Sequence, residues 1–182
     1  MRQKLDHILL FFSGICFANS IQLSDQSTIQ LLTCTPGTET WSKYGHTAIR
    51  VMDTENNLDI VFNYGIFDLM ADDFSLKFVR AATYHQLGVD RSPSFPAFYK
   101  RIGRLTYWQE LNRSTAQNQQ IFNALRENYQ PENRYYLYNF VLDNCATRPY
   151  YLIKQALNDT ITSTYIGYKG KTFREAISHY TG

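Results

Sequence analysis

The residues around Cys145 are of types that can make a cysteine nucleophilic. Cys145 directly follows Asp143 and Asn144, which are both residue types that cap helices. An apolar run at 150–157 can form the helix itself. A cysteine in the first turn of a helix faces unpaired backbone N–H groups and the positive end of the helix dipole. Both effects favour the thiolate and lower the pKa of the thiol, so the pattern predicts a nucleophilic cysteine.

A cysteine nucleophile needs a base that takes up its proton, and His46 is the histidine best placed for that role. It follows Gly45 and opens a β-prone run that extends to Met52. His85 lies in another β-prone run, at 84–89, and is kept as the reserve candidate for the base. Because a lone histidine is most often structural, His85 ranks below His46.

The composition is that of one globular domain without a nucleic-acid partner. With 182 residues the chain is long enough for one full hydrophobic core and too short for two comfortable ones. Its 44% hydrophobic and 19% charged residues argue against disorder. The net charge of +2 and the lack of a basic stripe exclude nucleic-acid binding. No cofactor is predicted.

The first 20 residues have the pattern of a signal peptide. Arg2 and Lys4 form a basic start, an apolar run follows at 8–18, and the small residues around 18–20 fit a cleavage site. The apolar run is shorter than the roughly 20 residues that span a bilayer. We therefore expect export, with a signal peptide at 1–20 and a single domain at 21–182. A buried first helix is the alternative interpretation of the run.

Export changes the interpretation of the cysteines, because only Cys34 and Cys145 remain after cleavage. In an oxidising compartment the two can form a disulfide that stabilises the fold. Against this, Cys34 lies in an apolar β-prone run at 29–35, where a free cysteine packs as a small hydrophobic residue. No short C-x-x-C or H-x-x-x-H spacing occurs, so no metal site is predicted.

β-prone and helical patterns are mixed along the chain, which predicts an α+β fold. The runs at 46–52 and 58–64, joined by a short polar turn, predict a β-hairpin. The sequence Ser-Thr-Ala-Gln at 114–117 is a capping box, which predicts the start of a helix that ends before Pro131. The other predicted strands lie at 28–35, 84–89 and 103–111, and the other predicted helices at 72–82, 93–101, 150–157 and 172–180.

Four short motifs follow one another along the chain: LLTCTPG at 31–37, YGHTAIRV at 44–51, FNYGIFD at 62–68 and DNCATR at 143–148. Together they resemble the Lnb N-terminal periplasmic domain family, from about Thr28 to the end of the chain. The order of a strand with Gly-His, a second strand and a later Asn-Cys before a helix also resembles a circularly permuted papain-like fold of the NlpC-related kind. Lecithin retinol acyltransferase shares this order of histidine before cysteine.

The resemblance implies a fold and an activity. The fold is a permuted papain-like one, in which the cysteine-bearing helix packs against a small antiparallel sheet. The activity is a thiol acyltransfer, which moves an acyl chain from a phospholipid to the α-amino group of a lipoprotein's N-terminal cysteine. The implied location is the periplasm, at a membrane surface. Family members usually carry a transmembrane region after this domain, and the sequence stops at Gly182 before one, so a longer natural protein is expected.

The resemblance also implies roles at the site. Cys145 would hold the acyl group as a thioester, and His46 would act as the base. Asn63 and Asp59 are the candidates for the residue that orients the imidazole. Asn63 is preferred, because it lies in the family-like Asn-Tyr-Gly and many papain-like enzymes use a neutral amide there. A role for Asn63 as a plain turn residue stays open.

Further residues are candidates for binding the substrate. An oxyanion hole could combine the backbone N–H of Cys145 with a donor from Tyr44, and packing of Tyr44 in the core is the competing interpretation. Asn144, beside the cysteine, belongs to the same candidate set. Arg148 or Arg50 could bind a lipid phosphate, and a solvated or ion-paired arginine is the alternative for both.

Two other functions stay open. The same fold permits a cysteine hydrolase that cleaves peptide or amide bonds of the cell wall. The chain can also be a non-catalytic exported module in which a disulfide joins Cys145 to Cys34.

Overall fold

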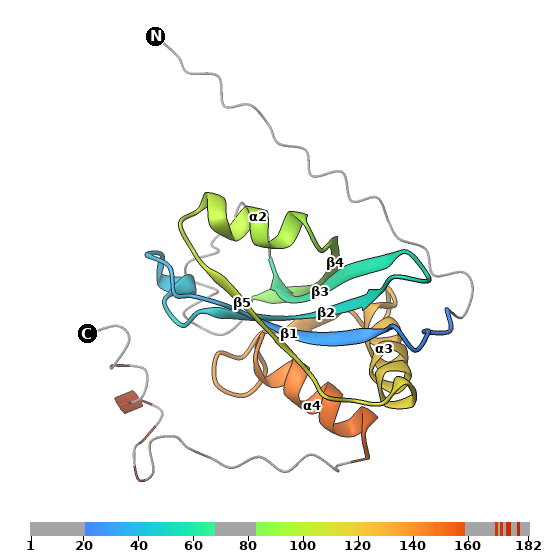
Figure 1. Ribbon diagram of the computed structural model, residues 1–182. Coiled ribbons are helices and arrows are strands. Elements are labelled where there is room, and N and C mark those ends of the chain that lie inside the picture. The colour runs from blue at the N-terminus through green and yellow to red at the C-terminus, as the bar shows by residue number, and fades with distance from the viewer. Residues whose placement is uncertain are drawn as a thin grey trace.

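The computed structural model describes residues 21–67 and 83–158, together with Gly170, Thr172, Arg174, Glu175 and Ser178. Its centre is an open, six-stranded antiparallel sheet with the strand order β5-β1-β2-β3-β4-β6 (Figure 1). The strands are β1 (Thr28–Cys34), β2 (His46–Asp53), β3 (Leu58–Ile66), β4 (Tyr84–Arg91), β5 (Thr106–Glu110) and β6 (Tyr135–Leu137). The described helices are the short 3₁₀ helix η1 (Thr40–Ser42) and the α-helices α2 (Ser94–Arg101), α3 (Thr115–Tyr129) and α4 (Thr147–Ala156). The predicted α+β class is confirmed.

The hairpin predicted at the centre of the sheet is also confirmed, since β2 and β3 pair in antiparallel register. Asp53 holds the turn between them, because its carboxylate accepts hydrogen bonds from the backbone N–H groups of Glu55 and Asn56. The same carboxylate accepts from the N–H and the hydroxyl of Ser24, at 2.7 and 2.6 Å. One buried side chain therefore joins the hairpin to the segment that precedes β1.

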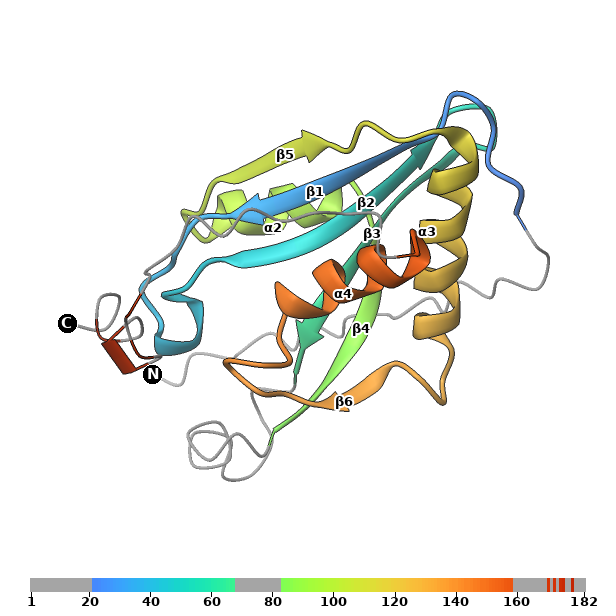
Figure 2. The same ribbon diagram turned by 90° about the horizontal axis from the view of Figure 1, so that it is seen from below.

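Side chains alternate between the two faces of the sheet, as the period of a β-strand requires. On one face α2 covers a small apolar cluster, which consists of Leu32, Cys34, Ala48, Val61, Phe95 and Tyr99. On the other face α3 and α4 cover the larger core, which includes Ile49, Val51, Phe62, Tyr64, Ile121, Phe122, Leu125 and Ile153. Figure 1 shows α2 on one side of the sheet and α3 and α4 on the other. α4 packs beside α3 and over β2 (Figure 2).

The capping box predicted at the start of α3 is present. The Ser114 side chain accepts a hydrogen bond from the N–H of Gln117, and the Gln117 side chain accepts one from the N–H of Ser114. Beyond this start, Ile121, Phe122 and Leu125 are completely buried. Truncating one of these side chains to alanine costs about 2–5 kcal/mol, so burial against the sheet is what keeps α3 in place.

Three predicted elements are not covered by this description. The predicted signal peptide at 1–20 and the predicted helix at 72–82 lie outside the described residues, and of the predicted helix at 172–180 only isolated positions are described. Among the described helices, none is long and apolar enough to cross a membrane.

Candidate active site

Cys145 and His46 meet beside Gly65. The thiol of Cys145 and the imidazole of His46 interact directly, because each shifts the pKa of the other. A Cβ atom at position 65 would lie 3.6 Å from Cys145 Cβ and 3.8 Å from His46 Cε1. His46 is the first residue of β2, and Cys145 lies in the loop between β6 and α4. The fold thus brings together the nucleophile and the base that the sequence predicts.

A β-bulge in β3 makes room for this contact. The register between β3 and β4 shifts between Asn63 and Ile66. Gly65, inside this stretch, has a φ of 87°, which only glycine adopts readily. Bulges bend a strand and redirect its side chains, and they are frequent next to active sites. Gly45 has a φ of 79°, and a Cβ there would lie only 2.8 Å from the Cys34 carbonyl oxygen, so glycine lets the chain enter β2 close to β1.

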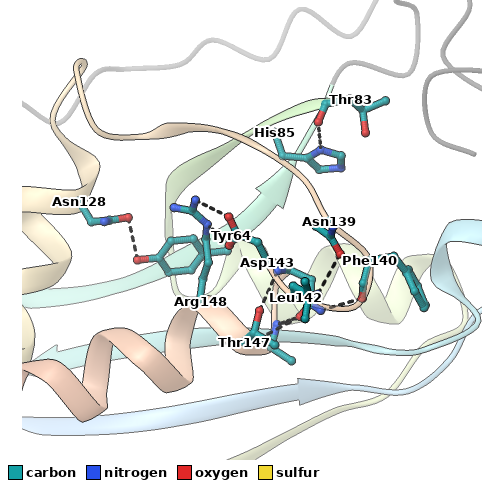
Figure 3. Close-up of polar contacts among 12 residues, drawn as sticks. Tyr64, Thr83, His85, Asn128, Asn139, Phe140, Leu142, Asp143, Thr147 and Arg148 are labelled. Carbon is teal, nitrogen blue, oxygen red and sulfur yellow. Dashed lines mark hydrogen bonds and ion pairs between the residues drawn. The ribbon is translucent and has the colours of Figure 1, made fainter. Parts of the chain in front are cut away.

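The loop before Cys145 is closed by Asn139 (Figure 3). The Asn139 side chain accepts hydrogen bonds from the backbone N–H groups of Val141 and Leu142, at 3.0 and 2.9 Å. The backbones of Asn139 and Asp143 exchange two more hydrogen bonds, both at 2.9 Å. These four bonds fix the loop directly upstream of the cysteine.

Asn144 then caps α4. Its side-chain oxygen accepts hydrogen bonds from the N–H groups of Ala146 and Thr147, at 2.9 and 3.0 Å. The Asn144 carbonyl also accepts a helix-like hydrogen bond from the N–H of Arg148, at 3.0 Å, so Cys145 lies in the capped turn that leads directly into the regular helix α4 at Thr147. Pro149 consequently falls in the first turn of α4, where a missing N–H is tolerated.

The pKa values of Cys145 and His46 are shifted toward a thiolate–imidazolium pair. Burial by itself would raise the pKa of Cys145, but the hydrogen bond and charge of His46 and the backbone N–H groups of Thr47 and Cys145 outweigh it and lower the pKa. Burial by itself would lower the pKa of His46, but its interactions with Cys145 and Asn63 outweigh it and raise the pKa. Both shifts favour the charged forms, which prepares the sulfur for nucleophilic attack.

Asn63 is hydrogen-bonded to the imidazole of His46. The distance between Asn63 Oδ1 and His46 Nε2 is 2.6 Å. Because an amide oxygen only accepts hydrogen bonds, Nε2 carries a proton and Nδ1 is the nitrogen that remains for the thiol. The other candidate, Asp59, instead forms an ion pair with Arg50 at 2.7 Å. The structure therefore brings Asn63 to the pair and occupies Asp59 and Arg50 with each other.

Tyr138 is a neighbour of the thiol that the sequence analysis missed. Burial raises the pKa of Tyr138, and its interaction with Cys145 raises it further. Its ring stacks on His85, with the ring centroids 4.2 Å apart. His85 itself lies with Nδ1 3.2 Å from the Thr83 carbonyl oxygen (Figure 3). The only signal for Tyr138 was an aromatic-rich run at 135–142, which does not distinguish one tyrosine from the next.

Two further predicted residues have structural partners. The ring of Tyr44 packs edge-to-face on Phe140, with centroids 4.4 Å apart. Arg148 forms an ion pair with Asp143, in which Nη2 and Oδ2 are 2.7 Å apart (Figure 3). The guanidinium of Arg148 also lies 3.6 Å above the ring of Tyr136. These contacts agree with the packing and ion-pair alternatives for Tyr44 and Arg148.

Both described cysteines are free, so the alternative Cys34–Cys145 disulfide is not formed. Cys34 is 1% exposed, and its sulfur lies 3.6 Å from Thr106 Oγ1. It pairs with His46 across β1 and β2, so it packs next to the site as a small apolar residue. Within the described part of the chain, no group of three His, Cys, Asp or Glu side chains is arranged to hold a metal ion.

Comparison with known proteins gives one match. The family model described as the Lnb N-terminal periplasmic domain matches residues 17–176, a range that includes Cys145, His46 and Asn63. No curated protein and no solved structure matches the chain. The family description confirms the predicted periplasmic location.

Proposed function

The chain belongs to the Lnb N-terminal periplasmic domain family, and from this premise we propose that it is a thiol acyltransferase. The acyl donor is a phospholipid at a membrane surface, and the acceptor is the N-terminal amine of a lipoprotein. The observation that carries the proposal is the contact between Cys145 and His46, whose pKa values are shifted in the directions that favour a thiolate and an imidazolium. Acyl transfer through a thioester needs such a thiolate next to a general base.

In the first half-reaction, the Cys145 thiolate attacks the ester carbonyl of the phospholipid. A carbon–sulfur bond forms, and the carbonyl electron pair moves onto oxygen to give a tetrahedral oxyanion. When the oxyanion collapses, the ester C–O bond breaks, and the protonated His46 donates its proton to the departing alkoxide. A lysophospholipid leaves, and the acyl group stays on Cys145 as a thioester.

In the second half-reaction, the neutral His46 imidazole accepts a proton from the acceptor amine as the amine nitrogen attacks the thioester. An amide C–N bond forms, and the carbon–sulfur bond breaks. Cys145 leaves as the thiolate, which restores the thiolate–imidazolium pair. Asn63 supports both halves, because its hydrogen bond to Nε2 holds the imidazole in one orientation.

Tyr138 is our candidate for stabilising the oxyanion. Its hydroxyl contacts the sulfur that carries the tetrahedral intermediate, and its raised pKa keeps the hydroxyl protonated as a donor. Tyr44, the candidate from sequence, has its ring against Phe140. We therefore assign the role to Tyr138 in place of Tyr44.

We also propose that the fold is a permuted papain-like one. The support is the order of the site along the chain, with His46 at the start of one strand, Asn63 on the next strand and Cys145 before a helix. An imidazole held by an amide on one nitrogen and facing a thiol is the arrangement of such enzymes.

The proposal is tested by looking for the acyl-enzyme. Mature protein is incubated with phospholipid vesicles whose acyl chains carry a mass label, and the intact mass is measured before and after hydroxylamine. We expect one acyl chain on Cys145, removed by hydroxylamine and lacking in the Cys145→Ala variant. A lipopeptide with a diacylglyceryl cysteine at its free N-terminus should then receive the chain on its amine.

Experiments on the same purified protein also test the two alternative functions. Cleavage of cell-wall peptides without any acyl adduct on Cys145 would replace the acyltransferase by a cysteine hydrolase. An unreduced protein that is two hydrogen atoms lighter, with Cys145 closed to alkylation until reductant is added, would favour the non-catalytic module with a Cys34–Cys145 disulfide.

A further inference from the structure

We propose that Asp90 is a positioning residue of this site, which acts through Asn63 to fix the orientation of the His46 imidazole and the nitrogen that faces Cys145. The inference rests on the proposed function insofar as Cys145 and His46 are the working pair. It extends the site by one residue, from the thiol and the imidazole through the amide to a carboxylate.

The sheet register places Asp90 next to Asn63. Asn63 pairs with Gly88 on β4, and Asp90 lies two residues further along β4, opposite Val61. Asn63 and Asp90 are therefore diagonal neighbours on the same face of the sheet. The side chain of Ile66 fills the space over Gly88, and the Asn63 amide lies close enough to Asp90 to lower the pKa of its carboxyl group.

The chemistry of a carboxylate then decides which way the amide points. A carboxylate only accepts hydrogen bonds, so Asn63 must present its NH₂ group to Asp90. This leaves Asn63 Oδ1 for His46 Nε2, which lies 2.6 Å away. An oxygen at Nε2 requires a proton on that nitrogen, and Nδ1 is left to accept the proton of the thiol. Without Asp90 the amide could turn over and offer its NH₂ group to Nε2, which selects the wrong tautomer.

Aromatic and charged groups from neighbouring elements also face the His46 imidazole. Tyr99 of α2 stacks on the His46 ring, with centroids 5.9 Å apart and planes at 17°. Arg104 lies near both Tyr99 and His46, where its positive charge disfavours the imidazolium. Cys34 adjoins them from β1. At Tyr99 the charges of Asp90 and Arg104 act in opposite directions, since Asp90 raises the pKa of the Tyr99 hydroxyl and Arg104 lowers it. Burial raises the pKa of Asp90, although Asn63 acts in the opposite direction.

The test measures the pH profile of Cys145 alkylation by iodoacetamide in the mature protein, which needs no knowledge of the substrate. Asp90→Asn keeps the shape of the side chain and removes its charge, and we expect the apparent pKa of Cys145 to rise by about half a unit to one unit. That corresponds to a loss of roughly three- to tenfold in alkylation rate below the pKa. Asp59→Asn, the same change on β3 at a residue paired with Arg50, is the matched control and should leave the profile unchanged.

A double-mutant cycle shows whether Asp90 acts through Asn63. In the Asn63→Ala background, Asp90→Asn should add no further shift. An equal shift in that background, or a wild-type profile in Asp90→Asn, overturns the proposal. Thermal unfolding of each variant identifies any loss that comes from misfolding. His46→Ala distinguishes failure of the proposed function from failure of the Asp90 proposal. An unshifted pH profile in His46→Ala overturns the Cys145–His46 pair itself. A shifted profile in His46→Ala together with an unshifted one in Asp90→Asn overturns only the role of Asp90.

Discussion

The Nε2 atom of His46 and the Oδ1 atom of Asn63 lie 2.6 Å apart, on the neighbouring strands β2 and β3. The strand that supplies this amide also contains Gly65, which leaves the space where Cys145 approaches the imidazole. One strand therefore orients the base and admits the nucleophile. A slip of one residue in β3 would turn Asn63 to the opposite face of the sheet, so the register of β3 determines whether the site exists.

We expect the alkylation rate of Cys145 to rise with pH around a midpoint below the free-cysteine value of about 8.5. His46→Ala should move the midpoint upward, because it removes the main partner that lowers the pKa of Cys145 while burial, which raises the pKa, remains. Mass spectrometry after timed alkylation measures the midpoint. Cys34, whose pKa is raised by burial, serves as the internal control and should react slowly in both proteins. An equal midpoint in both proteins contradicts the pair.

Gly65→Ala should lose activity out of proportion to its loss of stability. Position 65 has a φ of 87°, so alanine costs about 1–2 kcal/mol. The added methyl would also touch Cys145 Cβ and His46 Cε1, which should lower acyl transfer about 10- to 100-fold. Gly103→Ala is the matched control, since it has a φ of 72° and no atom within 4 Å of the added methyl. Similar losses of activity in both variants would mean that strain alone is responsible.

Tyr138→Phe should lower kcat about 100-fold, because it removes the hydroxyl assigned to the oxyanion and leaves the ring in place. Steady-state kinetics with labelled phospholipid measures the loss. Tyr135→Phe is the control from the same segment, because the Tyr135 side chain on β6 is 54% exposed. Full activity in Tyr138→Phe would transfer the oxyanion role to backbone N–H groups.

Asp53→Asn should destabilise the fold at neutral pH and not in acid. Burial by itself would raise the pKa of Asp53, but the hydrogen bonds of Ser24 and Asn56 outweigh it and lower the pKa to about 2. A group with a lowered pKa contributes stability above its unfolded value of 3.8, and the contribution is lost as the pH falls through about 2. We expect a loss of about 1–3 kcal/mol in the free energy of unfolding at pH 7.

Urea unfolding at pH 7 and near pH 2 measures this difference, which should shrink in acid. Asp59→Asn is the comparison, because its ion pair with Arg50 is partly exposed and is worth about 0–1 kcal/mol. A loss for Asp53→Asn that stays constant down to pH 2 would contradict a role for the ionised carboxylate.

Local patterns predicted the hairpin of β2 and β3, the capping box of α3 and the pairing of Cys145 with His46, because each depends on residues whose chemistry is specific. Asn144, one of the two predicted cap residues, does accept hydrogen bonds from the N–H groups of Ala146 and Thr147. The regular helix α4 begins only at Thr147, because Pro149 has no N–H to donate to the Cys145 carbonyl. Tyr138 and Asp90 were missed. Their contacts depend on the register of β4 and on the bulge in β3, and neither is encoded in a local pattern.

β6 has three residues and is the outermost strand on its side of the sheet, and the loop with Cys145 comes directly after it. The groups that lower the pKa of the thiol, the His46 imidazole and the Thr47 N–H, belong to β2, far earlier in the chain. A newly translocated, unfolded chain therefore carries an ordinary thiol with ordinary reactivity. The cysteine becomes a nucleophile only in the folded chain, where β6 and the loop after it bring the sulfur to β2.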